Sequence, residues 1–169
     1  MLGLYENFPP NVHKTLSFST LLSNKRLQQI LIQTLSEING KTFDLKEFSD
    51  PLIPNCTVIF EFGIAEASTF NYLDAEETNK ILKIIQKRPF QIMDFYCAIR
   101  YYKTQNGKRT PLKFDYYILR LIFDGGLLEA RVFHERGLQY VSPTDLVQFI
   151  VNKINAKTSR KLLKPLENP

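Results

Sequence analysis

The sequence has no tryptophan, only two histidines and no long hydrophobic run. No stretch approaches the ~18 consecutive apolar residues that a membrane-spanning helix requires. The N-terminal residues also lack the basic segment and apolar run of a secretory signal peptide. We therefore predict a cytoplasmic protein with no membrane association.

Motifs for metals and cofactors are also missing. The two cysteines and two histidines lie far apart along the chain, which does not match the spacing of a zinc site. There is no Gly-x-Gly-x-x-Gly and no Gly-Lys-Ser/Thr loop for nucleotide phosphates, and the acidic residues do not form a paired-carboxylate cluster. We therefore predict no metal, no cofactor and no assignable catalytic residue.

The two cysteines, Cys56 and Cys97, both lie inside apolar stretches. An unpaired cysteine behaves as a small hydrophobic residue and is usually buried. We expect two buried thiols, with a disulfide as the alternative.

The composition is typical of one globular domain, because hydrophobic residues make up 44% of the chain and charged residues 23%. Apolar residues recur with helical spacing after Ser23, Asp74 and Ser142, three residues of types that cap helix N-termini. Alternating or continuous apolar stretches predict strands at 12–20, 56–66, 91–103, 111–124 and 127–135.

The order of these elements predicts a single α+β domain with a mainly antiparallel sheet and about three helices. The sheet includes a three-stranded meander in the C-terminal half. We assign the domain to 1–156, with 1–10 as a lead-in, and expect 157–169 to be a basic, flexible tail. Residues 41–55 stay ambiguous, with a short edge strand through Phe43, Leu45 and Phe48 as one interpretation.

Two tight turns, Asn106-Gly107 and Gly125-Gly126, define a provisional register for the meander. This register places Tyr96, Tyr117 and His134 in one row, and Asp115 and Arg136 in the next. It leaves both faces of the sheet substantially apolar, so that each face needs a covering layer. A slip of one residue in either turn would rearrange the rows.

The row around His134 is the only group that resembles a pocket. A histidine beside a carboxylate can act as an acid or base near neutral pH, so one hypothesis is a small enzyme with a pocket at Tyr96, Tyr117, His134, Asp115 and Arg136. The alternative is that these residues are ordinary cross-strand neighbours, with Asp115 and Arg136 forming an ion pair.

Charge is distributed unevenly along the chain. Residues 1–77 contain 5 Lys and Arg against 10 Asp and Glu, whereas residues 78–169 contain 17 against 7. Many of the cations lie on and around the hairpin of the first turn or in the tail, and Tyr102 lies among those of the hairpin. These predicted nucleic-acid-binding residues are Arg100, Tyr102, Lys103, Lys108, Arg109, Lys113, Lys157, Arg160, Lys161 and Lys164.

Phosphate binding requires a track of Lys and Arg, and single strands also use aromatic faces for stacking. We therefore expect a non-catalytic accessory protein that associates with single- or double-stranded nucleic acid. The alternative is a protein-interaction subunit or homodimer with no nucleic-acid role, and the third hypothesis is the His134-centred enzyme. The pattern does not distinguish DNA from RNA.

Overall fold

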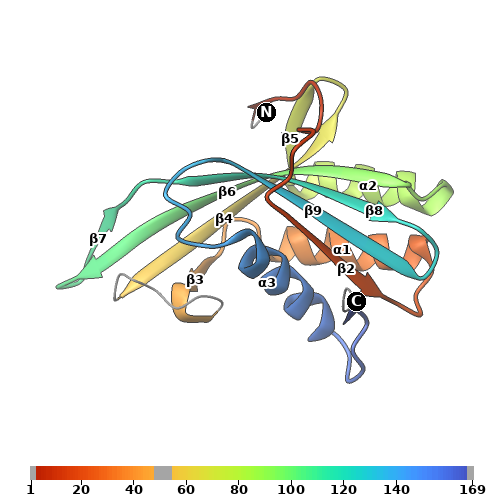
Figure 1. Ribbon diagram of the computed structural model, residues 1–169. Helices are drawn as coiled ribbons and strands as arrows, with labels where there is room; N and C mark the ends of the chain where they lie inside the picture. The colour runs from red at the N-terminus through yellow and green to blue at the C-terminus, as the bar shows by residue number, and fades with distance from the viewer. Residues whose placement is uncertain (1–2, 48–54, 167–169) are drawn as a thin grey trace.

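The computed structural model describes residues 3–47 and 55–166. Within these ranges the chain forms three α-helices and a ten-stranded sheet, which confirms the predicted single α+β architecture (Figure 1). The helices are α1 (Asn24–Ile38), α2 (Ala75–Lys87) and α3 (Pro143–Asn155). The strands are β1 (Gly3–Leu4), β2 (Lys14–Ser19), β3 (Thr42–Asp44), β4 (Cys56–Glu66), β5 (Thr69–Tyr72), β6 (Ile92–Gln105), β7 (Lys108–Pro111), β8 (Asp115–Phe123), β9 (Leu127–Arg136) and β10 (Lys164–Pro165).

The strands pair antiparallel in the order β1-β5-β4-β6-β8-β9-β2-β10, and β3 and β7 pair with β4 and β6 respectively. Residues 42–44 thus form the short strand that was one interpretation of the ambiguous segment. A short 3-10 helix, Leu45–Glu47, follows that strand, and Phe48 lies outside the described residues.

All three helices begin at the predicted capping residues. The side chains of Ser23 and Ser142 accept hydrogen bonds from backbone N–H groups three residues later, each at 3.1 Å. Asp74 accepts from the N–H of Glu77 at 2.8 Å. These bonds satisfy N–H groups that have no partner inside the helix, so local sequence is enough to define where each helix starts.

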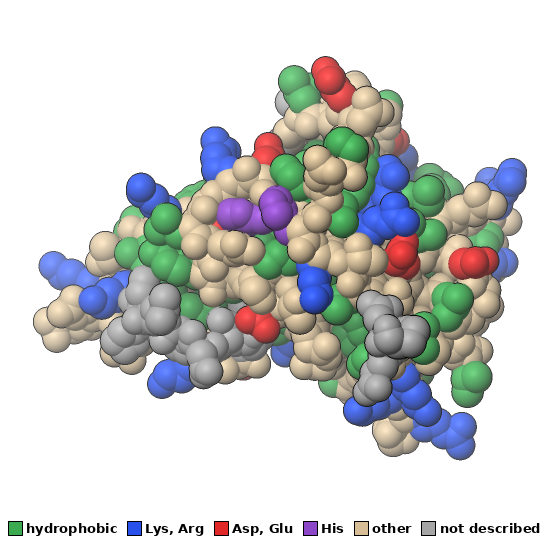
Figure 2. Space-filling model, in the orientation of Figure 1, with side chains coloured by type: hydrophobic (Ala, Val, Ile, Leu, Met, Phe, Trp, Pro, Cys, Tyr) green, Lys and Arg blue, Asp and Glu red, His purple; other side chains and the backbone are tan. Residues whose placement is uncertain are grey.

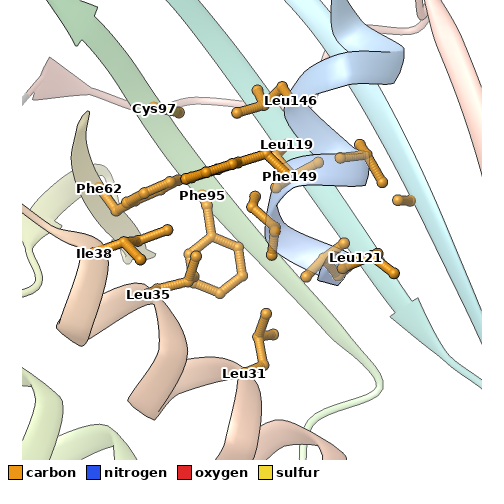
Figure 3. Close-up of a cluster of buried hydrophobic side chains, with 14 of the residues drawn as sticks. Leu31, Leu35, Ile38, Phe62, Phe95, Cys97, Leu119, Leu121, Leu146 and Phe149 are labelled. Atoms are coloured by element: carbon orange, nitrogen blue, oxygen red, sulfur yellow. The ribbon is translucent and has the colours of Figure 1, made fainter. Parts of the chain in front are cut away.

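The helices cover one face of the sheet, here called the inner face (Figure 1). Side chains from α1, α3 and the central strands meet there in a continuous apolar core (Figure 3). Gln28 of α1 is fully buried and bonds both backbone groups of Phe90, at 2.6 and 2.9 Å, which ties α1 to the segment after α2. Cys56 and Cys97 are buried free thiols, as predicted, and burial raises the pKa of both.

The register of the meander differs from the predicted one by a single residue. Gln105 pairs with Lys108 across the Asn106-Gly107 turn, as predicted, but Ile99 pairs with Asp115. Three residues, 112–114, therefore lie opposite two, Arg100 and Tyr101, which is the geometry of a β-bulge. Because side chains alternate between faces, this extra residue moves every later side chain of the strand to the other face relative to β6.

This one-residue shift in register determines which side chains of β8 lie on each face of the sheet. Leu119 and Leu121 join Phe95 on the inner face, whereas Arg120 joins Asp94 on the opposite, outer face. The outer face is mixed, because it carries the Arg120–Asp94 and Arg131–Glu129 ion pairs beside aromatic side chains, so it is less apolar than predicted. The inner face alone collects the core.

The N-terminal segment crosses the outer face. The Tyr5 hydroxyl donates to Asp94, and Asp94 accepts two further bonds from Arg120, at 2.8 and 2.9 Å. The guanidinium of Arg120 also lies 4.6 Å from the centre of the Phe8 ring. Phe8 and Arg120 line a groove of about 320 Å³ together with Glu129 and Arg131.

The expected flexible tail is packed against the domain as far as residue 166. Leu163 is fully buried, and the side chain of Asn155 bonds the backbone of both Leu162 and Leu163. β10 then pairs with β2. Apolar contact and backbone pairing outweigh the basic composition of this segment. No helix in the described part of the chain is long and apolar enough to cross a membrane.

Candidate nucleic-acid interface

Asp115 is a fully buried carboxylate at the start of β8. One of its oxygens accepts hydrogen bonds from His134 Nε2 at 2.8 Å and from the N–H of Gln139 at 2.6 Å. The other accepts from the Tyr101 hydroxyl at 2.6 Å and from the N–H of Tyr140 at 3.0 Å. Four donors thus compensate the cost of burying this group.

The bonds to Asp115 hold the loop of residues 137–141, which leads into α3. Gly137 has φ +121°, and a side chain there would overlap Asp115 Oδ1 and the carbonyl oxygen of Phe114. Gln139 also has a positive φ, 57°, although it is not glycine. Such backbone is strained and persists where surrounding bonds determine it, as the bonds to Asp115 do here.

Tyr117 completes this buried group, which we call the Asp115 anchor (Tyr101, Asp115, Tyr117, His134 and the loop 137–141). Its hydroxyl donates to the carbonyl of Val141, and its ring lies 5.0 Å from that of His134. Burial is the main cause that raises the pKa of Tyr101 and Tyr117, so both phenols stay neutral. The side-chain oxygens of Tyr101, Asp115 and Tyr117 all have partners within the protein, as expected for a group whose role is structural.

The predicted row around His134 is only partly present. Tyr117 and His134 are paired, as expected, but Cys97 rather than Tyr96 stands opposite Tyr117. Tyr96 lies on the outer face, and a register shift at Tyr116/Tyr117 pairs Arg136 with Tyr116. The side chain that bonds Asp115 from β9 is therefore His134, and the predicted pairing with Arg136 is wrong.

Arg136 instead belongs to an open depression on the surface, lined by Lys113, Phe114, Tyr116, Arg136, Gly137 and Leu138, with a volume of about 520 Å³. The Arg136 guanidinium lies 4.4 Å from the centre of the Tyr116 ring. Arg100 lies 5.2 Å from the ring centre of Phe114. Both rings are half-buried, while Lys113 and Arg136 are exposed. We call this site the aromatic depression.

The aromatic depression belongs to a longer run of rings on the outer face. Ring centres are 5.9 Å apart between Phe114 and Tyr116, 5.8 Å between Tyr116 and Tyr96, and 5.3 Å between Tyr96 and Phe70. Burial, followed by the charge of Glu135, raises the pKa of Tyr96. Glu135 therefore offsets part of the positive charge beside the rings.

The basic hairpin, residues 100–113, extends from this end of the sheet past the helical layer (Figure 1). Asn106 and Gly107 both have positive φ, which suits the tight turn that this dipeptide favours. Lys103, Lys108, Arg109 and Lys113 form no ion pair with any acidic residue in the described ranges, whereas Arg100 pairs with Glu61 at 2.6 Å. Tyr102 supports Arg109, whose guanidinium lies 4.3 Å from its ring centre.

The predicted tail cations lie elsewhere. Figure 2 shows basic side chains at the hairpin on the left and a second basic group at the lower right, around the end of α3. Lys157 is paired with Glu37 at 2.8 Å. Arg160, Lys161 and Lys164 line a groove of about 640 Å³ with Leu21, Leu22 and Leu162. The ten predicted nucleic-acid-binding residues are thus divided between two separate surfaces.

Sequence reasoning included Tyr116 among the tyrosines that interleave with the hairpin cations, but it missed the surface position of Phe114 and the contact of Gln139 with Asp115. The uninterrupted strand 111–124 placed both rings among apolar neighbours. Pro111 was the available signal, because proline cannot donate to a ladder and often ends a strand. No sequence signal marks Gln139, because its backbone contribution depends on the folded loop.

Comparisons of the chain with protein-family models, with curated proteins and with solved structures find no match. Within the described ranges, no group of three or more His, Cys, Asp or Glu side chains could hold a metal ion. The interpretation of the surface therefore depends on geometry and charge.

Proposed function

We propose that the protein is a non-catalytic nucleic-acid-binding or accessory protein, and that its basic hairpin contacts the phosphate backbone. The observation that carries the proposal is a cluster of four cations, Lys103, Lys108, Arg109 and Lys113, that form no ion pair with a described acidic residue and lie on a hairpin that extends past the helices. A polyanion gains affinity by releasing counterions when such cations approach its phosphates.

The local support of the hairpin favours this proposal. Arg109 packs on the Tyr102 ring, so part of its side-chain entropy is already lost before binding. The positions 100–113 carry no acidic residue that would repel phosphate. Acidic charge is instead concentrated in residues 1–77.

The test is a titration of the full chain with fluorescently labelled oligonucleotides, followed by anisotropy at several salt concentrations. Removing two hairpin charges, Lys108→Ala with Arg109→Ala, should weaken binding and reduce the slope of log K against log salt by about 1.4–1.8. The matched control is Arg160→Ala with Lys161→Ala, which removes the same charge from the other surface. It should bind nearly as tightly as the wild type. The absence of salt-dependent binding to any oligonucleotide, or an equal loss in both double variants, would contradict the proposal.

A second candidate function is self-association through the groove beside Leu21. Leu21 is fully exposed, and Leu166 has 42% of its surface exposed. Exposed apolar side chains of this size often lie in contacts between proteins. Light scattering at several concentrations tests this candidate: a dimer should be lost in Leu21→Asp, and a wild-type monomer at all concentrations would exclude self-association.

A further inference from the structure

The aromatic depression has features that phosphate binding alone does not need. Phe114 and Tyr116 present half-buried rings to an open hollow of about 520 Å³. Cations and hydrogen-bond donors contact the phosphate backbone, and the face of an aromatic ring provides neither. The rings therefore suit a second type of group on the same ligand.

The arrangement of charges around the rings suits a flat, π-bearing group that is linked to phosphates. The guanidiniums of Arg136 and Arg100 each lie over a ring, at 4.4 and 5.2 Å. Arginine stacks on nucleobases as well as on side-chain rings, and it contacts phosphate through its edge. Lys113 lies on the rim of the same hollow and in the basic hairpin, so the two surfaces are continuous.

We propose that the aromatic depression binds unpaired nucleobases of a single-stranded nucleic acid. Phe114 and Tyr116 provide the stacking faces, and Arg136 and Lys113 contact the adjoining phosphates. This inference rests on the proposed function and specifies the ligand of that surface. In a duplex the base faces are stacked against neighbouring pairs, so a double-stranded ligand offers phosphates to the hairpin but no free face to the rings.

The experiment uses the full chain and four labelled ligands of the same length: single-stranded DNA, single-stranded RNA, the duplex, and an abasic DNA strand that has phosphates but no bases. The variants Phe114→Leu and Tyr116→Leu remove one ring each and keep an apolar side chain. The matched control is Phe8→Leu. Phe8 also lies under an arginine, Arg120, but it lines the groove that includes Glu129 and Arg131 and not the aromatic depression. Circular dichroism and thermal unfolding establish that each variant is folded.

We expect at least one single strand to bind more tightly than the duplex and the abasic strand. Each ring variant should weaken that binding about 5- to 100-fold, a loss that persists at high salt, and Phe8→Leu should have no effect. The DNA and RNA arms decide which source of bases is preferred. If either ring variant does not fold, Arg136→Ala and the wild-type preference for bases over the abasic strand provide the same test.

Two results overturn the inference, and they differ in what they imply for the proposed function. Equal binding of the abasic strand, the duplex and the single strands, with no loss in the ring variants, would leave the hairpin as a phosphate-binding surface and exclude base stacking. Failure of every ligand to bind at low salt would contradict both proposals.

Discussion

The Asp115 anchor and the aromatic depression are neighbouring sites that share Gly137 and Leu138, and they differ in how completely their polar groups are partnered. Asp115 is fully buried and accepts four hydrogen bonds. In the aromatic depression, Lys113 has no ion pair with a described residue, and Arg136 is exposed over a ring.

This difference distinguishes residues that stabilise the fold from residues that remain available to bind a partner. A buried polar group whose partners are all internal has nothing left to offer a ligand, but its loss leaves several donors unsatisfied. A half-exposed ring beside an unpaired cation contributes less to folding and keeps its capacity for an external partner. The following substitutions test that division.

The largest effect is expected for Asp115→Ala, which removes the acceptor of four donors. We expect the free energy of unfolding to fall by about 3–5 kcal/mol, measured by urea denaturation followed by circular dichroism. The control is Glu129→Ala, which removes a partly exposed carboxylate paired with Arg131 on the outer face and should cost less than about 1 kcal/mol. An equal loss of unfolding free energy in the two variants would contradict the conclusion that the buried bonds of Asp115 stabilise the fold more than an ion pair on the outer face.

A smaller loss of stability is expected for Gly137→Ala. The added methyl group would meet Asp115 and the carbonyl of Phe114 at a backbone φ of +121°, so we expect a cost of about 2–4 kcal/mol in the same assay. Gly107→Ala serves as the control, because Gly107 has φ +75° but no atom within 4 Å of the new methyl group. It should cost about 1 kcal/mol. A similar cost at both positions would show that contact with the Asp115 anchor is unimportant.

The smallest effect is expected on the outer face, for Tyr5→Phe. Burial and the hydrogen bond to Asp94 raise the pKa of Tyr5 to about 12, whereas an unfolded tyrosine titrates near 10. The raised pKa means that the stabilisation is complete below pH 10 and is lost as the pH rises towards 12. The difference in unfolding free energy between wild type and Tyr5→Phe should therefore shrink over that interval, by less than about 1 kcal/mol because solvent screens the pair. A constant difference from pH 9 to 12 would exclude this linkage.

The parts of the fold that depend on neighbouring residues could be predicted from the sequence. Ser23, Asp74 and Ser142 begin helices because their side chains satisfy N–H groups within the next turn. The turn at Asn106-Gly107 forms because both residues tolerate a positive φ. Both features depend only on residues close in the chain.

The bulge at 112–114 could not be predicted in the same way. Its position depends on how the hairpin and the rest of β8 each pair with β6, and one extra residue decides which face receives Asp115, Tyr116 and Tyr117. The candidate residues of the His134 row were thus mostly identified, but Tyr96 and Arg136 were assigned to the wrong neighbours. The aromatic depression follows from the same extra residue.

The ends of the strand order also affect how molecules of this protein meet one another in solution. The path of the sheet begins with β1 and ends with β10, and each of these strands is only two residues long. An exposed edge strand can pair with a second chain and seed aggregation, and short strands, lysine and proline all oppose that addition. β10 consists of Lys164 and Pro165, and the proline has no N–H to donate to an incoming strand. A large antiparallel sheet is thereby protected at this margin against growth into fibres.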